Sequence, residues 1–307
     1  MKKALILGIS GSFGSHLARA LSAQGYALTA LVREPANIKT EHPGVHLVKG
    51  NVADRQALRT AAADHDIMVY AVNPANYDWQ DKAVPWLDNA AAVAEEFNMT
   101  LLFPGNVYIY DPADGPDFTE QSRACPKTDK GHTRQRMEQR LALAAEQGAQ
   151  VIIIRAGDFI AADAKTSWLN RLIVKKANSY KLTLPGRADI KHTWAYLPDV
   201  AVSAVNLLEN RHRLDAFSVH HFAGYQLSFD EMMTQIEQLT GKKVTQTSFP
   251  WWVIRLCSPF SVLMQGLLEM RYLWNNEVNL KNDRPDQFIL TTSQTPLATA
   301  LQRAGII

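Results

Sequence analysis

Cysteine is scarce in this sequence, and charge of neither sign is in excess. Two cysteines, Cys125 and Cys257, occur in 307 residues, and they form no Cys-x-x-Cys pair. This excludes a disulfide framework and a cysteine-based metal site, and we expect free thiols in a reducing compartment, the cytoplasm. Lysine and arginine (32) barely outnumber aspartate and glutamate (30), and the basic residues are scattered. The sequence therefore lacks the basic patch that nucleic-acid binding requires.

Uninterrupted apolar runs long enough to span a membrane are also missing. The most apolar stretch, residues 250–274, contains charged residues such as Arg255 and Glu269, and Pro259 divides it. This pattern predicts a pair of amphipathic helices. They would either cover a substrate cleft or form a subunit contact, as in a homodimer. No membrane partner is expected.

The strongest motif lies in the first 25 residues. Residues 4–7 are continuously apolar, as in a parallel strand that is buried on both faces, and an amphipathic helix ending at Gly25 follows. Between them, Gly8 permits a tight turn, Gly11 lets the backbone approach a pyrophosphate, and Gly14 lets the helix pack closely on the strand. The free N–H groups at the helix start favour a phosphate. We predict a dinucleotide site whose contacts here are Gly8, Ser10, Gly11, Ser12, Phe13 and Gly14.

Residues after the next strands complete the predicted cofactor site. Arg33 follows the apolar run 27–32, where dinucleotide-binding folds place the group that meets the adenosine ribose. An acid there binds the 2′-OH of NAD, whereas an arginine pairs with the 2′-phosphate of NADP, so Arg33 favours NADP over NAD. The other interpretation is a solvated arginine at a strand end. The loops after the third and fourth strands supply four further predicted contacts: Asn51, Val52, Ala71 and Asn73.

Strands and helices alternate through the first half of the chain. The runs 66–72, 99–103 and 150–159 are predicted strands, and a helix is expected from about Lys130 to Gln147. This alternation predicts an α/β fold with a doubly wound parallel sheet. We expect a cofactor-binding domain at residues 1–160, with returning segments near 190–225. A smaller, mostly helical substrate lobe would occupy residues 161–307.

These motifs together resemble the short-chain dehydrogenase/reductase superfamily, in its extended and atypical branches related to nucleotide-sugar epimerases and NAD-dependent epimerase/dehydratases. The glycine loop resembles the TGxxGxxG loop of extended members, with Leu7 in place of the threonine, and residues 50–54 resemble their GDxxD stretch. Residues 192–201 and 295–305 are similar to a strand-turn-helix and to the C-terminal helix of extended members. The resemblance implies a Rossmann fold and a bound NAD(P).

The catalytic positions of that superfamily are occupied by other residues here. Extended members carry a serine or threonine after the fifth strand, and a tyrosine followed four residues later by a lysine. The alignment places Asn106, Lys130 and Arg134 at these three positions, and no tyrosine of the chain has a lysine four residues later. The tyrosine acts as a general acid–base whose pKa the cation lowers. Lys130 beside Arg134 could replace it; alternatively, both cations bind cofactor phosphate, a substrate anion or a nearby carboxylate.

Other side chains are candidates for the substrate site. Tyr108 and Tyr110 follow the fifth strand, so either could supply the missing phenol. Their alternation with apolar residues also fits a half-buried extended segment. Asp158 and Phe159 end the sixth strand, where the resemblance implies contacts with substrate or the nicotinamide ribose. Asp158 could orient a substrate hydroxyl, or it could cap the following turn.

A metal site is not expected, because the adjacent His220 and His221 would point to opposite faces of a predicted strand. The sequence as a whole predicts an NADP-dependent oxidoreductase or epimerase that acts on an unidentified small carbonyl or hydroxyl compound with an altered active site. The alternative is a sensor that binds NADP without turnover and signals through a protein partner, as atypical relatives resembling nitrogen-metabolite regulators do.

Overall fold

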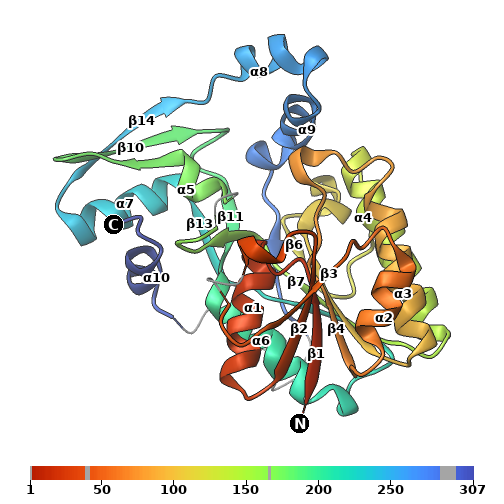
Figure 1. Cartoon of the computed structure of the whole chain (residues 1–307). Helices are drawn as coiled ribbons and strands as arrows, with labels where there is room; N and C mark the ends of the chain where they lie inside the picture. The colour runs from red at the N-terminus through yellow and green to blue at the C-terminus, as the bar shows by residue number, and fades with distance from the viewer. Residues whose placement is uncertain (1, 39–41, 165–166, 284–294) are drawn as a thin grey trace.

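The computed structural model describes residues 2–38, 42–164, 167–283 and 295–307. A seven-stranded sheet lies at its centre (Figure 1). Its strands are β1 (Lys3–Leu7), β2 (Ala27–Val32), β3 (His46–Lys49), β4 (Ile67–Tyr70), β5 (Thr100–Gly105), β7 (Gln150–Arg155) and β12 (Phe217–His221). They follow the order β12-β7-β5-β4-β1-β2-β3, and every neighbouring pair is parallel. The predicted parallel sheet is confirmed, and its carboxyl ends share one edge.

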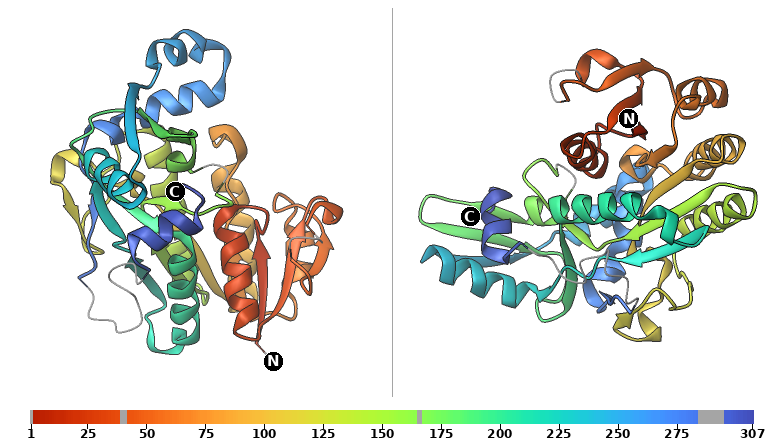
Figure 2. Two further views of the ribbon diagram at one scale, coloured as in Figure 1. Left: turned by 90° about the vertical axis from the view of Figure 1, so that its left-hand side faces the viewer. Right: turned by 90° about the horizontal axis from the view of Figure 1, so that it is seen from below.

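Helices cover both faces of this sheet (Figure 2). They are α1 (Ser12–Ala23) and α6 (Leu197–Glu209) on one face, and α2 (Arg55–Ala62), α3 (Ala83–Glu96) and α4 (Asp129–Glu146) on the other. Successive side chains of a strand point to opposite faces. Ala4 and Ile6 of β1 therefore pack in the core beneath α1 and α6, whereas Leu5 and Leu7 pack beneath the other three helices. Both sets are fully buried, which explains the continuous apolar run.

The predicted strand 150–159 is wrong in its last part, because β7 ends at Arg155. The chain then changes partner: β8 (Asp158–Ile160) pairs with β11 (Lys191–Tyr196), which also pairs with β13 (Tyr225–Ser228), in a separate sheet. Gly157 allows this crossing, since a Cβ there would lie 2.0 Å from the Thr193 carbonyl oxygen. The crossing carries Asp158 and Phe159 away from the main sheet.

The second half of the chain builds smaller sheets and helices around a separate apolar core that includes Trp194, Phe229 and Trp274. Besides β8, β11 and β13, these elements are the strands β9 (Ile173–Lys175), β10 (Ser179–Leu184) and β14 (Lys243–Ser248) and the helices α5 (Trp168–Leu172), α7 (Phe229–Thr240) and α10 (Leu297–Arg303). A further strand, β15 (Asn279–Leu280), pairs with β6 (Asp117–Phe118) of the first half. The predicted lobe thus contains strands as well as helices. Within residues 190–225, α6 and β12 are the segments that pack with the main sheet or join it. The division between residues 160 and 161 stays a prediction.

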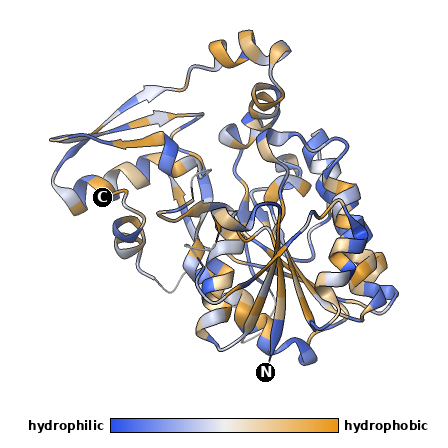
Figure 3. Cartoon of the chain, viewed as in Figure 1, coloured by the Kyte–Doolittle hydropathy of each residue, from blue (hydrophilic) through white to orange (hydrophobic). Residues whose placement is uncertain are grey.

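The stretch 250–274 forms two helices, as predicted. They are α8 (Trp251–Cys257) and α9 (Val262–Met270), joined by the 3-10 turn η6 (Ser258–Phe260), which contains Pro259. Hydrophobic residues predominate in the tip formed by α8 and η6 (Figure 3). Its exposed side chains include Trp252, Leu256 and Phe260. A homodimer through this tip stays a prediction. No described helix is both long and apolar enough to cross a bilayer.

We expect the Gly14→Ala variant to lose about 1–3 kcal/mol of unfolding free energy. The added Cβ would lie 2.3 Å from the Gly8 carbonyl oxygen, so α1 would have to move off the sheet. Gly11→Ala is the matched control, because its Cβ would lie 3.3 Å from the same oxygen. Urea unfolding of the ligand-free proteins measures both changes, and equal losses in the two variants would contradict the packing role of Gly14.

Candidate functional site

A cavity of about 1290 Å³ opens at the carboxyl edge of the main sheet. The loops after β1, β2 and β3, with Ala71 and Val72 after β4, form the walls at one end. The rest of the loop after β4 forms the walls at the other end, together with residues that follow β5 and β7 and parts of α5 and α9. Open α/β sheets bind their ligands at this edge. The two ends belong to one continuous space, so two ligands bound there would meet.

The glycine loop has the geometry of a phosphate site. Gly8 has a φ of +90°, and a Cβ on it would lie 2.6 Å from the Ala71 carbonyl oxygen. Gly11 is the N-cap of α1, and no side chain caps the helix, which leaves its first N–H groups available for an anion. Gly14 packs against Gly8 and lies outside the cavity wall, whereas Ser10, Ser12 and Phe13 line the cavity. The residues present therefore fit a dinucleotide pyrophosphate.

Arg33 lies where the adenosine end of a dinucleotide would be. Its side chain is exposed, lines the cavity, and forms no ion pair with the described residues. Asn51 and Val52 line the same end. Asn89 of α3 holds their loop by donating hydrogen bonds to the carbonyl oxygens of Val52 (3.2 Å) and Ala53 (3.0 Å). A free cation beside an ordered loop suits an adenosine phosphate.

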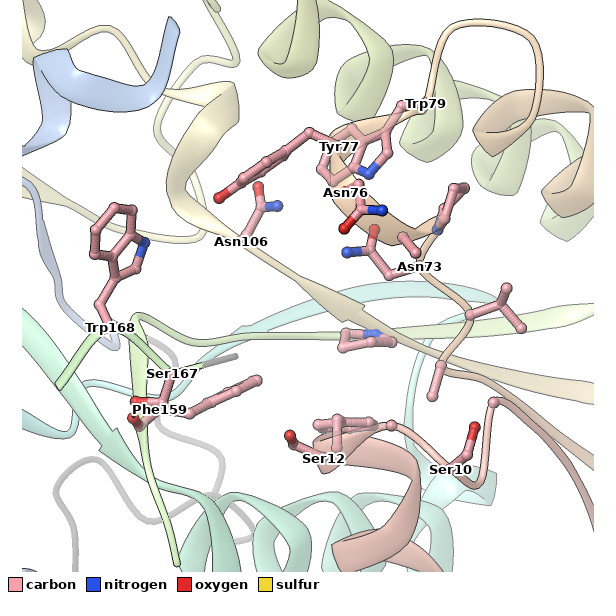
Figure 4. A pocket seen from close by; sticks show the side chains of 18 of the residues that line it. Ser10, Ser12, Asn73, Asn76, Tyr77, Trp79, Asn106, Phe159, Ser167 and Trp168 are labelled. Atoms are coloured by element: carbon pink, nitrogen blue, oxygen red, sulfur yellow. Dashed lines mark hydrogen bonds between the residues drawn. The ribbon is translucent and has the colours of Figure 1, made fainter. Parts of the chain in front are cut away.

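Aromatic side chains surround the opposite end of the cavity (Figure 4). The Tyr77 hydroxyl points toward Trp168, and burial raises the pKa of Tyr77 above its usual value. Trp79 stacks on Tyr108, with 6.3 Å between the ring centroids. Asn76 and Tyr77 have φ values of 57° and 59°, a left-handed conformation that is uncommon for side chains other than asparagine and therefore unusual for Tyr77. The loop after β4 is thus held in a conformation that directs Tyr77 into the cavity.

Asp158 is the titratable acid of this end. It lines the cavity, is mostly buried, and forms no ion pair with the described residues. Burial raises the pKa of Asp158 to about 7. Burial also raises the pKa of Tyr108 well above its usual range, so this phenol stays protonated at neutral pH and is able to donate a hydrogen bond. Asp158 can therefore both accept and release a proton near pH 7.

Lys130, the predicted substitute for the family tyrosine, does not line the cavity. Its ammonium lies 2.6 Å from a carboxylate oxygen of Glu269 on α9, and its backbone N–H donates to the other oxygen at 2.7 Å. The same ammonium lies over the Tyr77 ring, 5.3 Å from its centroid. The catalytic interpretation of Lys130 is therefore not supported, and its carboxylate alternative is the observed one. Lys130 ties α9 to α4 above the cavity.

Gly266 completes this closure. A Cβ on it would lie 2.6 Å from the Cβ of Tyr77, so α9 rests directly on the tyrosine that faces the cavity. Leu263 and Leu267 of the same helix line the cavity. Of the two roles foreseen for the apolar stretch, α9 takes the covering one.

Tyr110, predicted to contact substrate, is placed elsewhere. It is 2% exposed, its hydroxyl lies 2.8 Å from Nε2 of His221, and its ring stacks on Phe118. The extended segment expected here is also wrong. Residues Val107–Ile109 form a 3-10 turn (η3), which Asn106 closes by accepting the Tyr108 N–H at 3.1 Å. Tyr108 thus lies within a turn and Tyr110 directly after it, and of the two tyrosines Tyr108 lines the cavity.

Most of the predicted site residues share the cavity wall, and their chemical roles stay predictions. Those that line it are Gly8, Ser10, Gly11, Ser12, Phe13, Arg33, Asn51, Val52, Ala71, Asn73, Asn106, Tyr108, Arg134, Asp158 and Phe159. Sequence reasoning missed Tyr77, Trp168 and Phe249. Tyr77 lies on a loop that was expected to meet ligands, whereas no local pattern marks the other two.

One group among the described residues has metal-ligand geometry: single ligand atoms of Asp111, Asp114 and Cys125 lie within 4.8 Å of one another. Asp111 is already paired with Lys127 at 2.9 Å. An acidic pair with a lysine counter-ion needs no metal to neutralise it. The expectation of no metal site stays a prediction.

The sequence of residues 8–166 matches the family model described as NAD(P)H-binding. No curated protein gives a significant sequence match.

Solved structures with a similar fold include a UDP-galactose 4-epimerase, with 13% identity and a TM-score of 0.74 over 99% of this chain and 97% of that one. The UDP-glucuronic acid 4-epimerase of Bacillus cereus, in complex with NAD, has 15% identity and a TM-score of 0.73 over 98% and 96%. A short-chain dehydrogenase/reductase superfamily protein of Agrobacterium tumefaciens with bound NAD has 17% identity and a TM-score of 0.73 over 98% and 95%. At these identities the likeness concerns the fold.

A double-mutant cycle with Lys130→Met and Glu269→Gln is expected to give a coupling energy of about 1–3 kcal/mol, because each single change leaves a largely buried charge without its partner. The control is the half-exposed pair of Lys82 and Asp78, four residues apart in the loop before α3, for which Lys82→Met and Asp78→Asn should couple by less than about 0.5 kcal/mol. Chemical denaturation measures both cycles. Equal coupling energies would contradict the role of Lys130 as the tie to α9.

Asp158→Asn is expected to stabilise the ligand-free protein at pH 8 and to have little effect at pH 3. The folded-state pKa of about 7 lies above the ordinary value of 3.8, so the folded protein holds a proton that the unfolded chain releases. Stability therefore falls as pH rises between these values and is lowest above pH 7. The gain at pH 8 has an upper limit of about 4 kcal/mol, at about 1.4 kcal/mol per pKa unit. Melting curves across this pH range test it; a pH-independent difference would contradict it.

Proposed function

This chain belongs to the NAD(P)H-binding family, and from that premise we propose that it is an NADP-dependent oxidoreductase or epimerase acting on a small hydroxyl or carbonyl compound. Its fold is epimerase/dehydratase-like. The observation that supports the proposal most directly is the continuity of the cavity, which joins the glycine loop to Tyr108 and Asp158. A cofactor on the loop would share this space with a substrate that contacts a titratable acid.

The proposed preference for NADP over NAD rests on Arg33. Its guanidinium forms no ion pair with the described residues and stands at the cavity wall beside the Asn51 loop. A planar cation of this kind matches the 2′-phosphate, which NAD lacks. The acidic Glu34 lines the same region, but Arg33 is the residue that directly follows β2.

A nicotinamide dinucleotide, when bound, supplies hydride chemistry, and the chain supplies the proton chemistry. Asp158 is proposed to accept the proton of a substrate hydroxyl or to return it to a carbonyl oxygen. Tyr108 is proposed to orient the same oxygen as a hydrogen-bond donor. The closure by α9 would keep bulk water from the reacting atoms.

A sensor that binds NADP without turnover is the second candidate. It is favoured by the pairing of Lys130 with Glu269, which leaves the family's acid–base position without an available acid. The two candidates differ in outcome when the protein is incubated with NADP or NADPH and a panel of small alcohols and carbonyl compounds. An enzyme changes the reduction state of the cofactor with some member of the panel. A sensor instead changes its affinity for a protein partner between NADP and NADPH.

Calorimetric titration should show NADP and NADPH binding more tightly than NAD and NADH. Arg33→Ala is expected to weaken NADP by tenfold or more and leave NAD within about twofold, since a charged hydrogen-bonded pair contributes about 1.5–3 kcal/mol. Gly11→Asp should abolish all four, because it places a carboxylate where the pyrophosphate binds. Gly25→Asp, at the other end of α1, is the control for the added charge. Absence of any dinucleotide binding by the wild-type protein would overturn the proposal.

A further inference from the structure

Arg134 is a buried cation that forms no ion pair with the described residues. The residue is 8% exposed, and its guanidinium has two long hydrogen bonds of 3.4 Å, to the carbonyl oxygen of Pro104 and to Oδ1 of Asn73. Its Nε–H has no acceptor, and no carboxylate of the described residues pairs with it. A guanidinium carries five N–H donors. Most of its hydrogen-bonding capacity is therefore unused.

Arg155, at the end of β7, is a buried arginine that does not line the cavity, and it is paired differently. It is 1% exposed, and Glu138 accepts two hydrogen bonds from it at 2.8 and 2.9 Å. Burying a charge costs several kcal/mol unless a counter-ion offsets it. Arg134 has instead the faces of Trp79 and Phe103, 4.9 and 5.3 Å from its guanidinium carbon. These rings hold the cation in place but accept no strong hydrogen bond.

The guanidinium belongs to the substrate end of the cavity. It lines the cavity beside Asn73 and Pro104, at the carboxyl ends of β4 and β5. Tyr108 interacts electrostatically with both Arg134 and Asp158, so it lies within reach of the two charged groups. The cofactor phosphates have other donors, namely the uncapped start of α1 and Arg33. An anion that pairs with Arg134 would therefore come from the substrate and not from the cofactor.

We propose that Arg134 binds a carboxylate of the substrate, so that the substrate is a small hydroxy or oxo acid with an aromatic or other apolar body. This inference rests on the proposed function and names its substrate class. The carboxylate would take the unused N–H groups in the planar geometry that arginine favours. Tyr77, Trp79 and Trp168 would pack against the apolar body, and the hydroxyl or carbonyl group beside the carboxylate would then face Asp158 and Tyr108.

The test compares phenylglyoxylate with phenylglyoxylamide, its neutral isostere, by calorimetry on the free protein and on the protein saturated with NADP. The wild-type protein should bind the carboxylate at least tenfold more tightly than the amide. Arg134→Met should remove this preference and leave NADP affinity within twofold, whereas Arg134→Lys should restore part of it. Thermal melting of ligand-free Arg134→Met should occur no lower than that of the wild-type protein, because an uncompensated buried charge has been removed.

Three results would overturn the proposal. The first is equal or undetectable binding of the two probes by the wild-type protein. The second is a loss of NADP affinity in Arg134→Met with the carboxylate preference retained, which would assign the guanidinium to the cofactor. The third is a large drop in melting temperature of that variant, which would assign it to the fold. If NADP itself fails to bind, the proposed function fails, and the comparison on the free protein still decides the role of Arg134.

Discussion

The common direction of the seven central strands is the constraint on which the rest of the structure depends. Parallel strands place all their carboxyl ends at one edge. Residues as distant in sequence as Gly8, Asn51, Asn73 and Asn106 therefore follow their strands into a shared space. The helices that return the chain between strands bury both faces of the sheet, so this edge is where side chains remain free to meet a ligand.

Local pattern was sufficient for the parts of the molecule whose structure depends on local sequence. The apolar run 4–7, the glycine spacing and the helix that Gly25 ends are each determined within a few residues, and the structure contains all of them. The cavity wall beside the glycine loop could thus be predicted almost residue by residue, and the contacts of these residues with a cofactor stay a prediction. Its geometry depends on backbone positions of strands and loops, which periodicity and glycine report directly.

The substrate end depends on contacts between distant segments, and there the sequence predicted less. Lys130 was assigned from its alignment, but its partner Glu269 lies 139 positions later on a helix whose location no local pattern reveals. Tyr110 was proposed for the site because it follows the fifth strand, and alternation suggested an extended segment there, but Asn106 caps a 3-10 turn instead. The end of β7 was missed because the apolar residues Phe159 and Ile160, which lie beyond the crossing at Gly157, read as a continuation of the same strand. In each case a long-range or side-chain-to-backbone contact overrode the local preference.

The tie between Lys130 and Glu269 has a consequence for the order in which a ribosome can complete this protein. The glycine loop and the strands that frame it are present once the first third of the chain has been made, whereas α9, which covers the far end of the cavity, comes from the last fifth. Until residue 269 has emerged from the ribosome, the aromatic side chains beneath α9 and the Lys130 ammonium lack their partners and are exposed to water. A growing chain thus forms its glycine loop early and covers the far end of the cavity with α9 late. Chaperones that shield apolar surface would therefore be needed longest at that end.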